Sequence, residues 1–270
     1  MINLLDSTKM KKILTYLIIF IGVFQTARAQ QDLDRANDLF EKAYYVDAIA
    51  LYEAALPKNK SSHLIKNLAD SYYHTFDLNA AARWYRYLIS NYGDTVDESY
   101  YFKLNQSLKA IGEYEEAESV LFNFYAKEGT IAKLQQLKQN ATYLENVKAI
   151  GNRFDIENSH FNTTSSEFGA MEIGNEVWYT ATHKKSGSKT YRWNNQHYLD
   201  IYTHPLYKKE LGDSLSTELS NKINTKLHEG AFTISPDGNT LYFTRNNFKN
   251  GKRKTDDKKI SNLKIYSANL

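Results

Sequence analysis

The sequence predicts an α+β multidomain protein in which an all-α helical solenoid is followed by all-β blades of an incomplete β-propeller. Residues 31 to about 148 carry Ala, Leu and Tyr at the three- and four-residue spacing of amphipathic helices, and this pattern recurs along the chain. From residue 154 onward, short alternating apolar stretches bounded by Gly, Asn, Asp and Pro replace it. The 270 residues, 42% of them hydrophobic, are enough to build a core in each part.

The first 29 residues have the parts of a secretory signal peptide. Lysines at positions 9, 11 and 12 precede an apolar run that ends at Phe24, and Ala27-Arg28-Ala29 supplies the small-x-small pattern that a signal peptidase reads. A membrane anchor is the alternative, but the run is shorter than the roughly 20 residues that a spanning helix needs. We therefore expect export, cleavage after Ala29 and no transmembrane helix in the mature chain.

The charge balance argues against nucleic acid as a partner. The leader contains four of the 34 Lys and Arg residues and one of the 31 Asp and Glu residues, which leaves 30 of each in the remaining chain. Nucleic-acid binding needs clustered, uncompensated positive charge. The Lys-rich stretch from Lys249 to Lys259 contains two aspartates and is predicted to be a solvated hairpin loop. Cysteine is absent, which excludes disulfides, thiolate metal sites and a lipid-modified cysteine.

Residues 30–150 are predicted to form a helical repeat domain. Two copies of an eight-position pattern lie 33 residues apart, and a third is displaced by 36 because Gly93-Asp94-Thr95 lengthens the preceding connection. An unrelated helical bundle is the alternative, and a final helix from Ile131 to Val147 would cap the array. The copies are Ala36, Leu39, Ala43, Tyr45, Ala48, Tyr52, Ala55 and Leu56; Ala69, Tyr72, Phe76, Leu78, Ala81, Tyr85, Leu88 and Ile89; and Asn105, Leu108, Gly112, Tyr114, Ala117, Leu121, Phe124 and Tyr125.

A period near 34 with this pattern resembles the tetratricopeptide repeat. Small residues at positions 36, 48, 69, 81 and 117 would let two antiparallel helices approach closely, while the aromatic residues fill the gaps between pairs. The first helix of each pair would line a groove of the kind that binds peptides, although ordinary solvated helix positions are the alternative. The repeat register places seven residues in this groove: Asn37, Phe40, Asp70, Tyr73, His74, Gln106 and Lys109.

Residues 151–270 are predicted to form about two β-blades, each a triplet of strands. The first two strands of each triplet are joined by a tight turn, Gly174-Asn175-Glu176 in one and residues 235–239 in the other, whose Gly and Asn tolerate positive φ. Each third strand follows a long polar stretch. The six strands are Phe168–Ile173, Val177–Thr182, Tyr198–His204, Gly230–Ile234, Thr240–Arg245 and Leu263–Asn269.

The second triplet carries a specific motif. Residues 229–245, EGAFTISPDGNTLYFTR, resemble a PD40 repeat, the WD40-like blade unit of TolB-type propellers. Ser235, Pro236, Asp237 and Gly238 would form its turn, in which the Asp carboxylate acts as a cap. The first triplet, in which Ser-Glu-Phe-Gly-Ala occupies residues 166–170, is a degenerate copy. The apolar residues that would point into the core between blades are Phe232, Ile234, Leu241 and Phe243.

Leader, tetratricopeptide array and PD40 blades in this order resemble the N-terminal part of OmpA-family envelope proteins of Gram-negative bacteria, which end in a peptidoglycan-binding OmpA-like domain. The resemblance implies a non-enzymatic cell-envelope scaffold, exported to the periplasm and associated with the outer membrane. Its groove and propeller would bind envelope proteins, and peptidoglycan would be contacted only through the C-terminal domain that this chain lacks. Two blades are fewer than a propeller needs, so we expect a fragment or an early-terminated version of a longer protein.

No constellation of residues predicts catalysis, a cofactor or a metal. The histidines at positions 63, 74, 160, 183, 197, 204 and 228 include no His-Glu-x-x-His pair. The sequence contains no Walker-type phosphate loop, no Gly-x-Gly-x-x-Gly and no Gly-x-Ser-x-Gly. Ser235 precedes Pro236 at a hairpin, not at the strand-to-helix elbow of a nucleophile. We therefore expect no enzyme, and no catalytic, cofactor-binding or metal-binding residues.

Two other functions fit parts of the sequence. The blades could belong to the propeller of a prolyl-oligopeptidase-like serine peptidase, although such enzymes do not usually carry a tetratricopeptide array in front. A glycan-binding surface protein would instead use exposed aromatic rings as stacking platforms, for which Trp178, Trp193 and Tyr191 are available. Trp178 lies in a predicted strand and is expected in the core.

Overall fold

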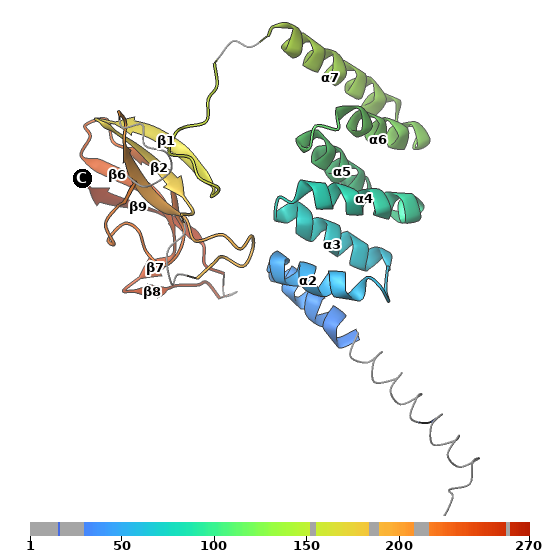
Figure 1. Ribbon diagram of the computed structural model, residues 1–270, viewed down its shortest axis with the longest axis horizontal. Helices are drawn as coiled ribbons and strands as arrows, with labels where there is room; N and C mark the ends of the chain where they lie inside the picture. The colour runs from blue at the N-terminus through green and yellow to red at the C-terminus, as the bar shows by residue number, and fades with distance from the viewer. Residues whose placement is uncertain (1–15, 17–29, 152–154, 184–188, 208–215, 258–259) are drawn as a thin grey trace, which may run out of the picture. The chain divides into compact units, whose positions relative to one another are not determined.

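The computed structural model describes residue 16 and residues 30–151, 155–183, 189–207, 216–257 and 260–270 (Figure 1). The predicted signal peptide, residues 1–29, lies outside these residues except for Tyr16. The chain divides near Gly151 into a helical unit and a β unit, which are described in turn. Within the described ranges, no helix has the length and apolar character needed to cross a membrane.

The helical unit consists of consecutive helix pairs followed by one further helix. The first pair is formed by residues 30–41 and α2 (Tyr45–Ala55), the second by α3 (Ser62–His74) and α4 (Leu78–Tyr92), and the third by α5 (Glu98–Ala110) and α6 (Tyr114–Lys127). A short 3-10 helix, η1 (Gly93–Thr95), occupies the predicted longer connection, and α7 (Ile131–Ala149) follows the third pair. The predicted repeat pattern thus coincides with the helix pairs.

Each pair turns through one residue in the left-handed region. Ala43, Phe76 and Gly112 occupy the same position of the three repeats and have φ angles of 56°, 63° and 85°. The residue after each of them donates its backbone N–H to a carbonyl of the last turn of the preceding helix, at 2.9 to 3.1 Å. This is the bond pattern that satisfies the free carbonyls at a helix C-terminus, and glycine adopts it with the least strain.

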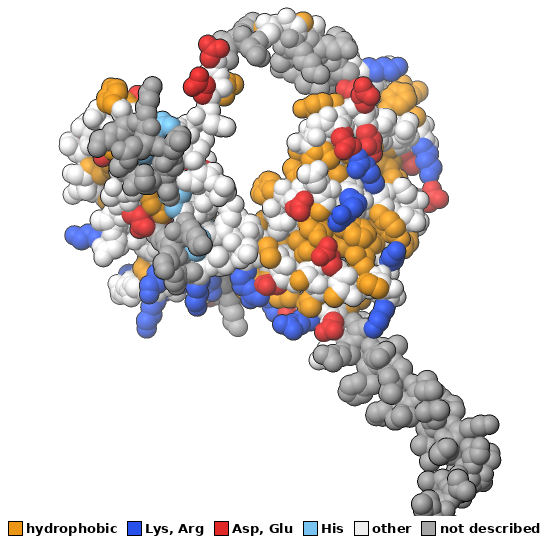
Figure 2. Space-filling view, viewed as in Figure 1, with side chains coloured by type: hydrophobic (Ala, Val, Ile, Leu, Met, Phe, Trp, Pro, Cys, Tyr) orange, Lys and Arg blue, Asp and Glu red, His pale blue; other side chains and the backbone are white. Residues whose placement is uncertain are grey.

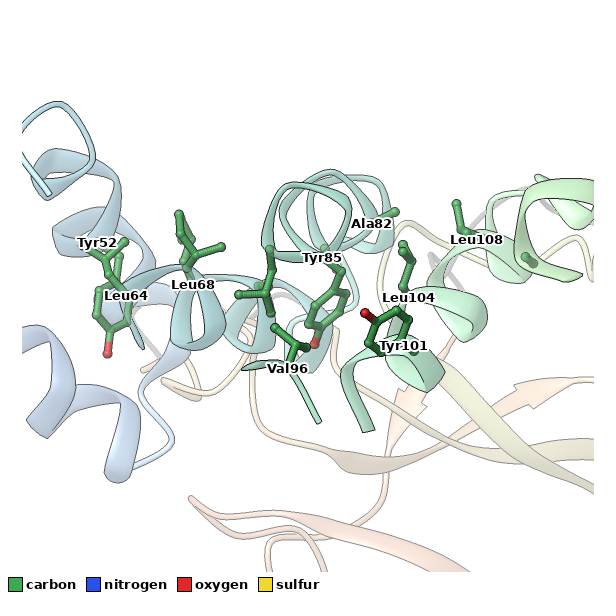
Figure 3. Close-up of a cluster of buried hydrophobic side chains, with 14 of the residues drawn as sticks. Tyr52, Leu64, Leu68, Ala82, Tyr85, Val96, Tyr101, Leu104 and Leu108 are labelled. Carbon is green, nitrogen blue, oxygen red and sulfur yellow. The ribbon is translucent and has the colours of Figure 1, made fainter. Parts of the chain in front are cut away.

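The core of the helical unit is continuous across the three pairs (Figure 3). Tyr52, Leu68 and Tyr85 are fully buried in it, and Leu104 and Leu108 continue it into the third pair. The small residues that the repeat predicted at the helix crossings, Ala36, Ala48, Ala69, Ala81 and Ala117, are all 0% exposed. Close approach of the two helices therefore depends on side chains that end at Cβ.

The β unit contains two antiparallel sheets and a small hairpin. The first sheet has the order β1-β2-β3-β4, and the second has the order β5-β6-β9. The six predicted strands correspond to the longer ones within two residues at each end, and the short β4 was not predicted. The bounds are β1 Glu167–Ile173, β2 Glu176–Ala181, β3 Asp200–Pro205, β4 Thr217–Glu218, β5 Glu229–Ile234, β6 Thr240–Asn246, β7 Phe248–Lys249, β8 Lys252–Arg253 and β9 Leu263–Asn269.

A face of the first sheet packs against a face of the second. Trp178 and Ile201 lie in one buried cluster with Leu241 and Phe243, and the rings of Trp178 and Phe232 are 6.3 Å apart. Phe232, Ile234, Leu241 and Phe243 all belong to this cluster, as the sequence predicted. Because Trp178 is only 9% exposed, it is a core residue and offers no stacking surface for a sugar.

The turn between β5 and β6 has the predicted chemistry. The carboxylate of Asp237 accepts hydrogen bonds from the Ser235 hydroxyl at 2.5 Å and from the backbone N–H of Asn239 at 3.2 Å. These donors hold the pKa of Asp237 below its usual value, the bond from Ser235 most of all. Gly238 has a φ of 75°, which favours glycine at this position. Ser235, Pro236, Asp237 and Gly238 therefore form a structural turn.

An Asn-Thr-x-x-x-Glu sequence precedes each sheet, a motif that the sequence patterns did not single out. In the second copy, the Glu229 carboxylate accepts bonds from the hydroxyl of Thr225 at 2.6 Å and from its backbone N–H at 2.9 Å. In the first copy, Glu167 accepts the same two bonds from Thr163. Each glutamate thus fixes the loop that leads into its sheet.

Burial shifts the pKa values of two adjacent ionisable groups at this loop in opposite directions. Burial raises the pKa of Glu229 to about 7, although the bonds from Thr225 oppose the shift. Burial lowers the pKa of His228 to about 4, and its Nδ1 accepts a bond from the backbone N–H of Leu199 at 3.1 Å. Both side chains therefore favour the neutral form in the folded β unit.

We predict that a leucine in place of a buried crossing alanine destabilises the helical unit. Ala48→Leu adds three carbon atoms at a fully buried position of α2, and we expect it to lower the free energy of unfolding by about 1 to 3 kcal/mol. Ala50→Leu in the same helix points to solvent and is the matched control, expected to change stability by less than about 0.5 kcal/mol. Urea unfolding followed by circular dichroism measures both; equal effects would contradict the close crossing.

A second prediction concerns pH. Glu229 has a pKa above the 4.5 of an ordinary glutamate, so its burial destabilises the fold increasingly as pH rises from 4.5 to about 7. His228 has a pKa below the ordinary 6.5, so its burial destabilises the fold increasingly as pH falls from 6.5 to about 4. Between pH 4.5 and 6.5 the two effects oppose each other.

Relative to the parent protein, Glu229→Gln should therefore make the free energy of unfolding rise with pH in this window, and His228→Gln should make it fall. Each slope is expected to reach up to about 1.4 kcal/mol per pH unit. Urea unfolding followed by tryptophan fluorescence at several pH values measures the difference. Profiles that stay parallel to that of the parent in both variants would show that neither group titrates with folding.

Candidate functional site

The groove face is the surface shared by the first helices of the pairs, namely residues 30–41, α3 and α5. Two tyrosines from the second helices, Tyr52 of α2 and Tyr85 of α4, lie 33 residues apart and reach into the space between successive first helices. Both are fully buried, and each hydroxyl is hydrogen-bonded to polar side chains on a first helix. These buried tyrosines therefore support the groove face from the side of the second helices.

The bridge at Tyr52 joins the first two pairs. Its hydroxyl donates to Oδ1 of Asn37 at 2.7 Å and accepts a bond from Nδ2 of Asn67 at 3.0 Å. Asn67 also donates to Asn37 at 3.3 Å, which closes a triangle. Burial raises the pKa of Tyr52 to about 12, so the phenol stays protonated and keeps its role as donor.

The bridge at Tyr85 uses equivalent positions with charged partners. Its hydroxyl donates to Oδ1 of Asp70 at 2.6 Å, and the same oxygen accepts a bond from the Lys103 ammonium at 2.7 Å. Asp70 is at the position of Asn37, and Lys103 is at the position of Asn67 once the longer third connection is counted. Burial and the neighbouring Asp70 carboxylate both raise the pKa of Tyr85, burial most of all. The Asp70 and Lys103 side chains are largely shielded from solvent, which strengthens their charge-assisted hydrogen bond.

The third junction replaces this bridge. Leu121 of α6 is at the position of Tyr85, and Gln106 is at the position of Asp70, so the tyrosine hydroxyl of the bridge has no equivalent here. Instead, Tyr125 near the end of α6 donates to Oε1 of Glu98 at 2.6 Å, and Lys133 of α7 forms a salt bridge with Glu98 at 2.6 Å. These bonds depress the pKa of Glu98, that from Lys133 most of all, so the carboxylate is ionised near neutral pH.

An open pocket of about 600 Å³ lies on the groove face between α3 and α5. It is lined by Tyr73 from α3 and by Glu98, Ser99, Phe102 and Lys103 from α5. The Phe102 side chain is 50% exposed although the residue is hydrophobic. The walls thus combine two aromatic rings with a carboxylate, a hydroxyl and an ammonium group, each of which a bound molecule could contact.

The seven residues predicted for the groove fall into three groups. Tyr73 lines the pocket, and Asp70 holds the pocket residue Lys103. Asn37 accepts the hydrogen bond from Tyr52. Phe40 packs edge-on against Tyr45, and His74 stacks on the same tyrosine ring with the ring centroids 4.7 Å apart. Gln106 and Lys109 are half-buried further along α5, and their side chains form no hydrogen bond with another described residue. Burial lowers the pKa of His74.

The sequence patterns missed four of the pocket residues, namely Glu98, Ser99, Phe102 and Lys103. Projection of the repeat onto α5 gave Gln106 and Lys109, which lie about one turn further along the helix. A usable signal was the equivalence of Asn67 and Lys103, which places a polar donor beside each bridging tyrosine. Figure 2 shows hydrophobic side chains gathered over the helical unit, with acidic and basic groups set among them.

Among the described residues, no group of three or more His, Asp or Glu side chains is placed to hold a metal ion. Of the other predicted candidates, Tyr191 is half-buried and its ring packs against Tyr198 and His228 at 5.8 and 4.5 Å. It is therefore part of an aromatic cluster in the β unit.

We predict that removing one bridging hydroxyl destabilises the array. Tyr85→Phe deletes the buried donor to Asp70 and should lower the free energy of unfolding by about 1 to 3 kcal/mol. Tyr87→Phe, in the same helix but only half-buried, is the matched control, with an expected change below about 0.5 kcal/mol. Chemical unfolding of both variants gives the comparison. If the two cost the same, the bridge contributes nothing.

The helix pairs, the steps of 33 and 36 residues and the repeated left-handed turns make the helical unit tetratricopeptide-like. No protein-family model matches the sequence, and no curated protein matches it. Among solved structures, the crystal structure of the yeast Tom70 is similar at 18% identity with a TM-score of 0.37. The similarity covers 46% of this chain and 26% of the yeast chain, so this chain spans about a quarter of the length of that protein.

Proposed function

We propose that this protein is a non-enzymatic scaffold whose helical groove binds an extended peptide segment of a partner protein. The observation that carries the proposal is the pocket between α3 and α5, where a half-exposed phenylalanine stands beside Tyr73. An apolar side chain of the partner would enter between Tyr73 and Phe102. The burial of such an anchor contributes most of the binding energy in recognition of this kind.

The polar rim of the pocket supports a peptide over other ligands. Ser99, Glu98 and Lys103 surround the aromatic walls with one hydroxyl, one carboxylate and one ammonium group. A peptide backbone presents both N–H donors and C=O acceptors on either side of each side chain, which matches a rim of mixed character. Lys103 is held by Asp70, and Glu98 by Lys133, so the rim is arranged before a ligand arrives.

For the β unit we propose that the two sheets are PD40-type blades of a β-propeller. The Ser-Pro-Asp-Gly turn, the antiparallel strand order and the face-to-face packing of the sheets support this assignment. The blades would offer a second surface for a protein partner, which would make the chain a connector between two proteins.

The place of action that we propose is the periplasm, in association with the outer membrane. This part of the proposal rests on the leader pattern and on the resemblance to OmpA-family envelope proteins, which pair such modules with a peptidoglycan-binding domain. The partners would then be envelope proteins, and peptidoglycan would be reached only through an OmpA-like domain.

A substitution at the pocket tests the groove. We expect peptides selected from a random library on the parent protein to bind Phe102→Glu at least about tenfold more weakly, because a carboxylate replaces the apolar wall. Phe122→Glu on α6 is the matched control, since Phe122 is similarly exposed but lies on a second helix. Fluorescence polarisation with labelled peptides measures the affinities.

Charge reversal at Asp70 is a poorer test because it would also break the bridge to Tyr85. Equal affinities of the parent and Phe102→Glu for every selected peptide would contradict the groove proposal. So would weakening by Phe122→Glu alone, because that result would place the binding surface on the second helices.

A further inference from the structure

The two sheets of the β unit are copies related by a fixed step along the chain. Each residue pair formed by β2 and β3 recurs in β6 and β9 64 residues later. Trp178 pairs with Thr203 as Tyr242 pairs with Ser267, and Thr180 pairs with Ile201 as Thr244 pairs with Ile265. The step also holds beyond the strands, because the backbone N–H of Leu206 donates to Asn175 and that of Leu270 donates to Asn239, both at 3.0 Å.

The equivalence extends to the two buried clusters. Phe161, Val177, Tyr179 and Tyr202 form the cluster on one face of the first sheet, and their counterparts Ile223, Leu241, Phe243 and Tyr266 lie on the matching face of the second. The first strand of each sheet is the exception: β5 follows β1 by a step of 62, because the turn between β5 and β6 is two residues longer than that between β1 and β2. Each sheet therefore has one face that carries its own cluster, here called the inner face, and an opposite face, here called the outer face.

The outer face of the first sheet is covered by the inner face of the second. Trp178 is 9% exposed, and Thr180 and Ile201 are each 0% exposed. Gly230 of β5 approaches so closely that a Cβ there would lie 3.4 Å from a methyl group of Thr180 and 3.9 Å from Leu199. The outer face of the first sheet thus contributes a Trp-x-Thr segment and a Leu-x-Ile segment to this junction. The inner face of the second sheet contributes a Gly-x-Phe segment and a Leu-x-Phe segment.

The outer face of the second sheet repeats the covered surface but is open among the described residues. Tyr242, Leu263 and Ile265 are at the positions of Trp178, Leu199 and Ile201, and their exposures are 44%, 64% and 78%. Thr244 is at the position of Thr180, so the polar residue of the surface is reproduced as well. Apolar side chains that are buried in the first sheet but exposed at the equivalent positions of the second indicate an interaction surface.

A second junction element points the same way. The side chain of Asn224, which precedes the second sheet, accepts a bond from the backbone N–H of Ile201 at 3.0 Å and donates to its carbonyl at 2.9 Å. It thereby fastens the second sheet to strand β3 of the first. An equivalent asparagine from a following sheet would form the same two hydrogen bonds with the backbone of Ile265 on β9.

We propose that the outer face of the second sheet is the docking surface for a further antiparallel sheet of the same repeat. Its occupant carries the inner-face pattern of Gly230, Phe232, Leu241 and Phe243 and an asparagine at the position of Asn224. This inference rests on the proposal that the sheets are blades, but it requires neither the groove nor the closure of a ring. The surface continues an interface that the molecule already contains, which sets the chemistry of the partner.

The test extends the full chain by one further copy of residues 207–270, attached directly after Leu270. The step of 64 residues places this copy in register, because Leu270 is equivalent to Leu206. Hydrogen exchange of the β6 and β9 amides is then compared with that of the original chain. We expect exchange to slow by at least about tenfold, because the docked copy buries Tyr242, Leu263 and Ile265.

Ile265→Asp supplies the matched variant. In the original chain it should leave the urea midpoint and the exchange rates of β6 unchanged, because Ile265 is 78% exposed. In the extended chain the same substitution should abolish the added protection, whereas Lys249→Asp, on the β7–β8 hairpin, should not. Protection that survives Ile265→Asp would overturn the proposal, since the copy would then be docked elsewhere.

Two further outcomes separate this inference from the assignment of the sheets as blades. A copy that becomes protected in its own strands without protecting β6 and β9 would overturn the docking surface and leave the blade assignment in place. A copy that stays unprotected throughout would count against both. If the original chain already sediments as a dimer that Ile265→Asp dissociates, a second molecule is the occupant, and the proposed partner is wrong.

Discussion

The hydrogen bond from a buried tyrosine hydroxyl to a polar side chain on the groove face is the constraint on which the helical unit depends. Tyr52 and Tyr85 each come from a second helix and tie two successive first helices together. An apolar residue could fill the same volume but could not set the rotation of one pair against the next, because dispersion contacts are not directional. The position of Lys103, and with it one wall of the pocket, follows from the second of these bridges.

The apolar repeat was readable from the sequence because its cause is local. Small residues at the helix crossings, with aromatic residues between them, recur every 33 or 36 residues, and these positions predicted the helix pairs. The pocket was not readable in the same way. Phe102 looks like one more aromatic residue of an amphipathic helix, and only the packed pairs show that it is half-exposed beside Tyr73. Similarly, the link between Asp70 and Lys103 crosses from one pair to the next.

In the β unit, the turn chemistry was predictable and the loops were not. Gly238 and Asp237 have conformational and hydrogen-bonding preferences that act within a few residues, so their turn could be placed before the fold was known. The Asn-Thr-x-x-x-Glu segments look like ordinary polar loops. Their importance appears only when Glu229 is found buried, with both oxygens accepting from Thr225, and when Asn224 is found on the backbone of the preceding sheet. Polar groups that satisfy one another leave no trace in a hydrophobic pattern.

The replacement of the bridging tyrosine by Leu121 has a consequence for how the array loosens. The third junction is held by the contact of Glu98 with Tyr125 and Lys133, and both ionic side chains are more than two-fifths exposed. Added electrolyte screens such a pair far more than it weakens a buried bond. Fraying should therefore begin at α6 and α7 as ionic strength rises. Since Glu98 also lines the pocket, the same rise in salt concentration would make the polar rim of the pocket less rigid.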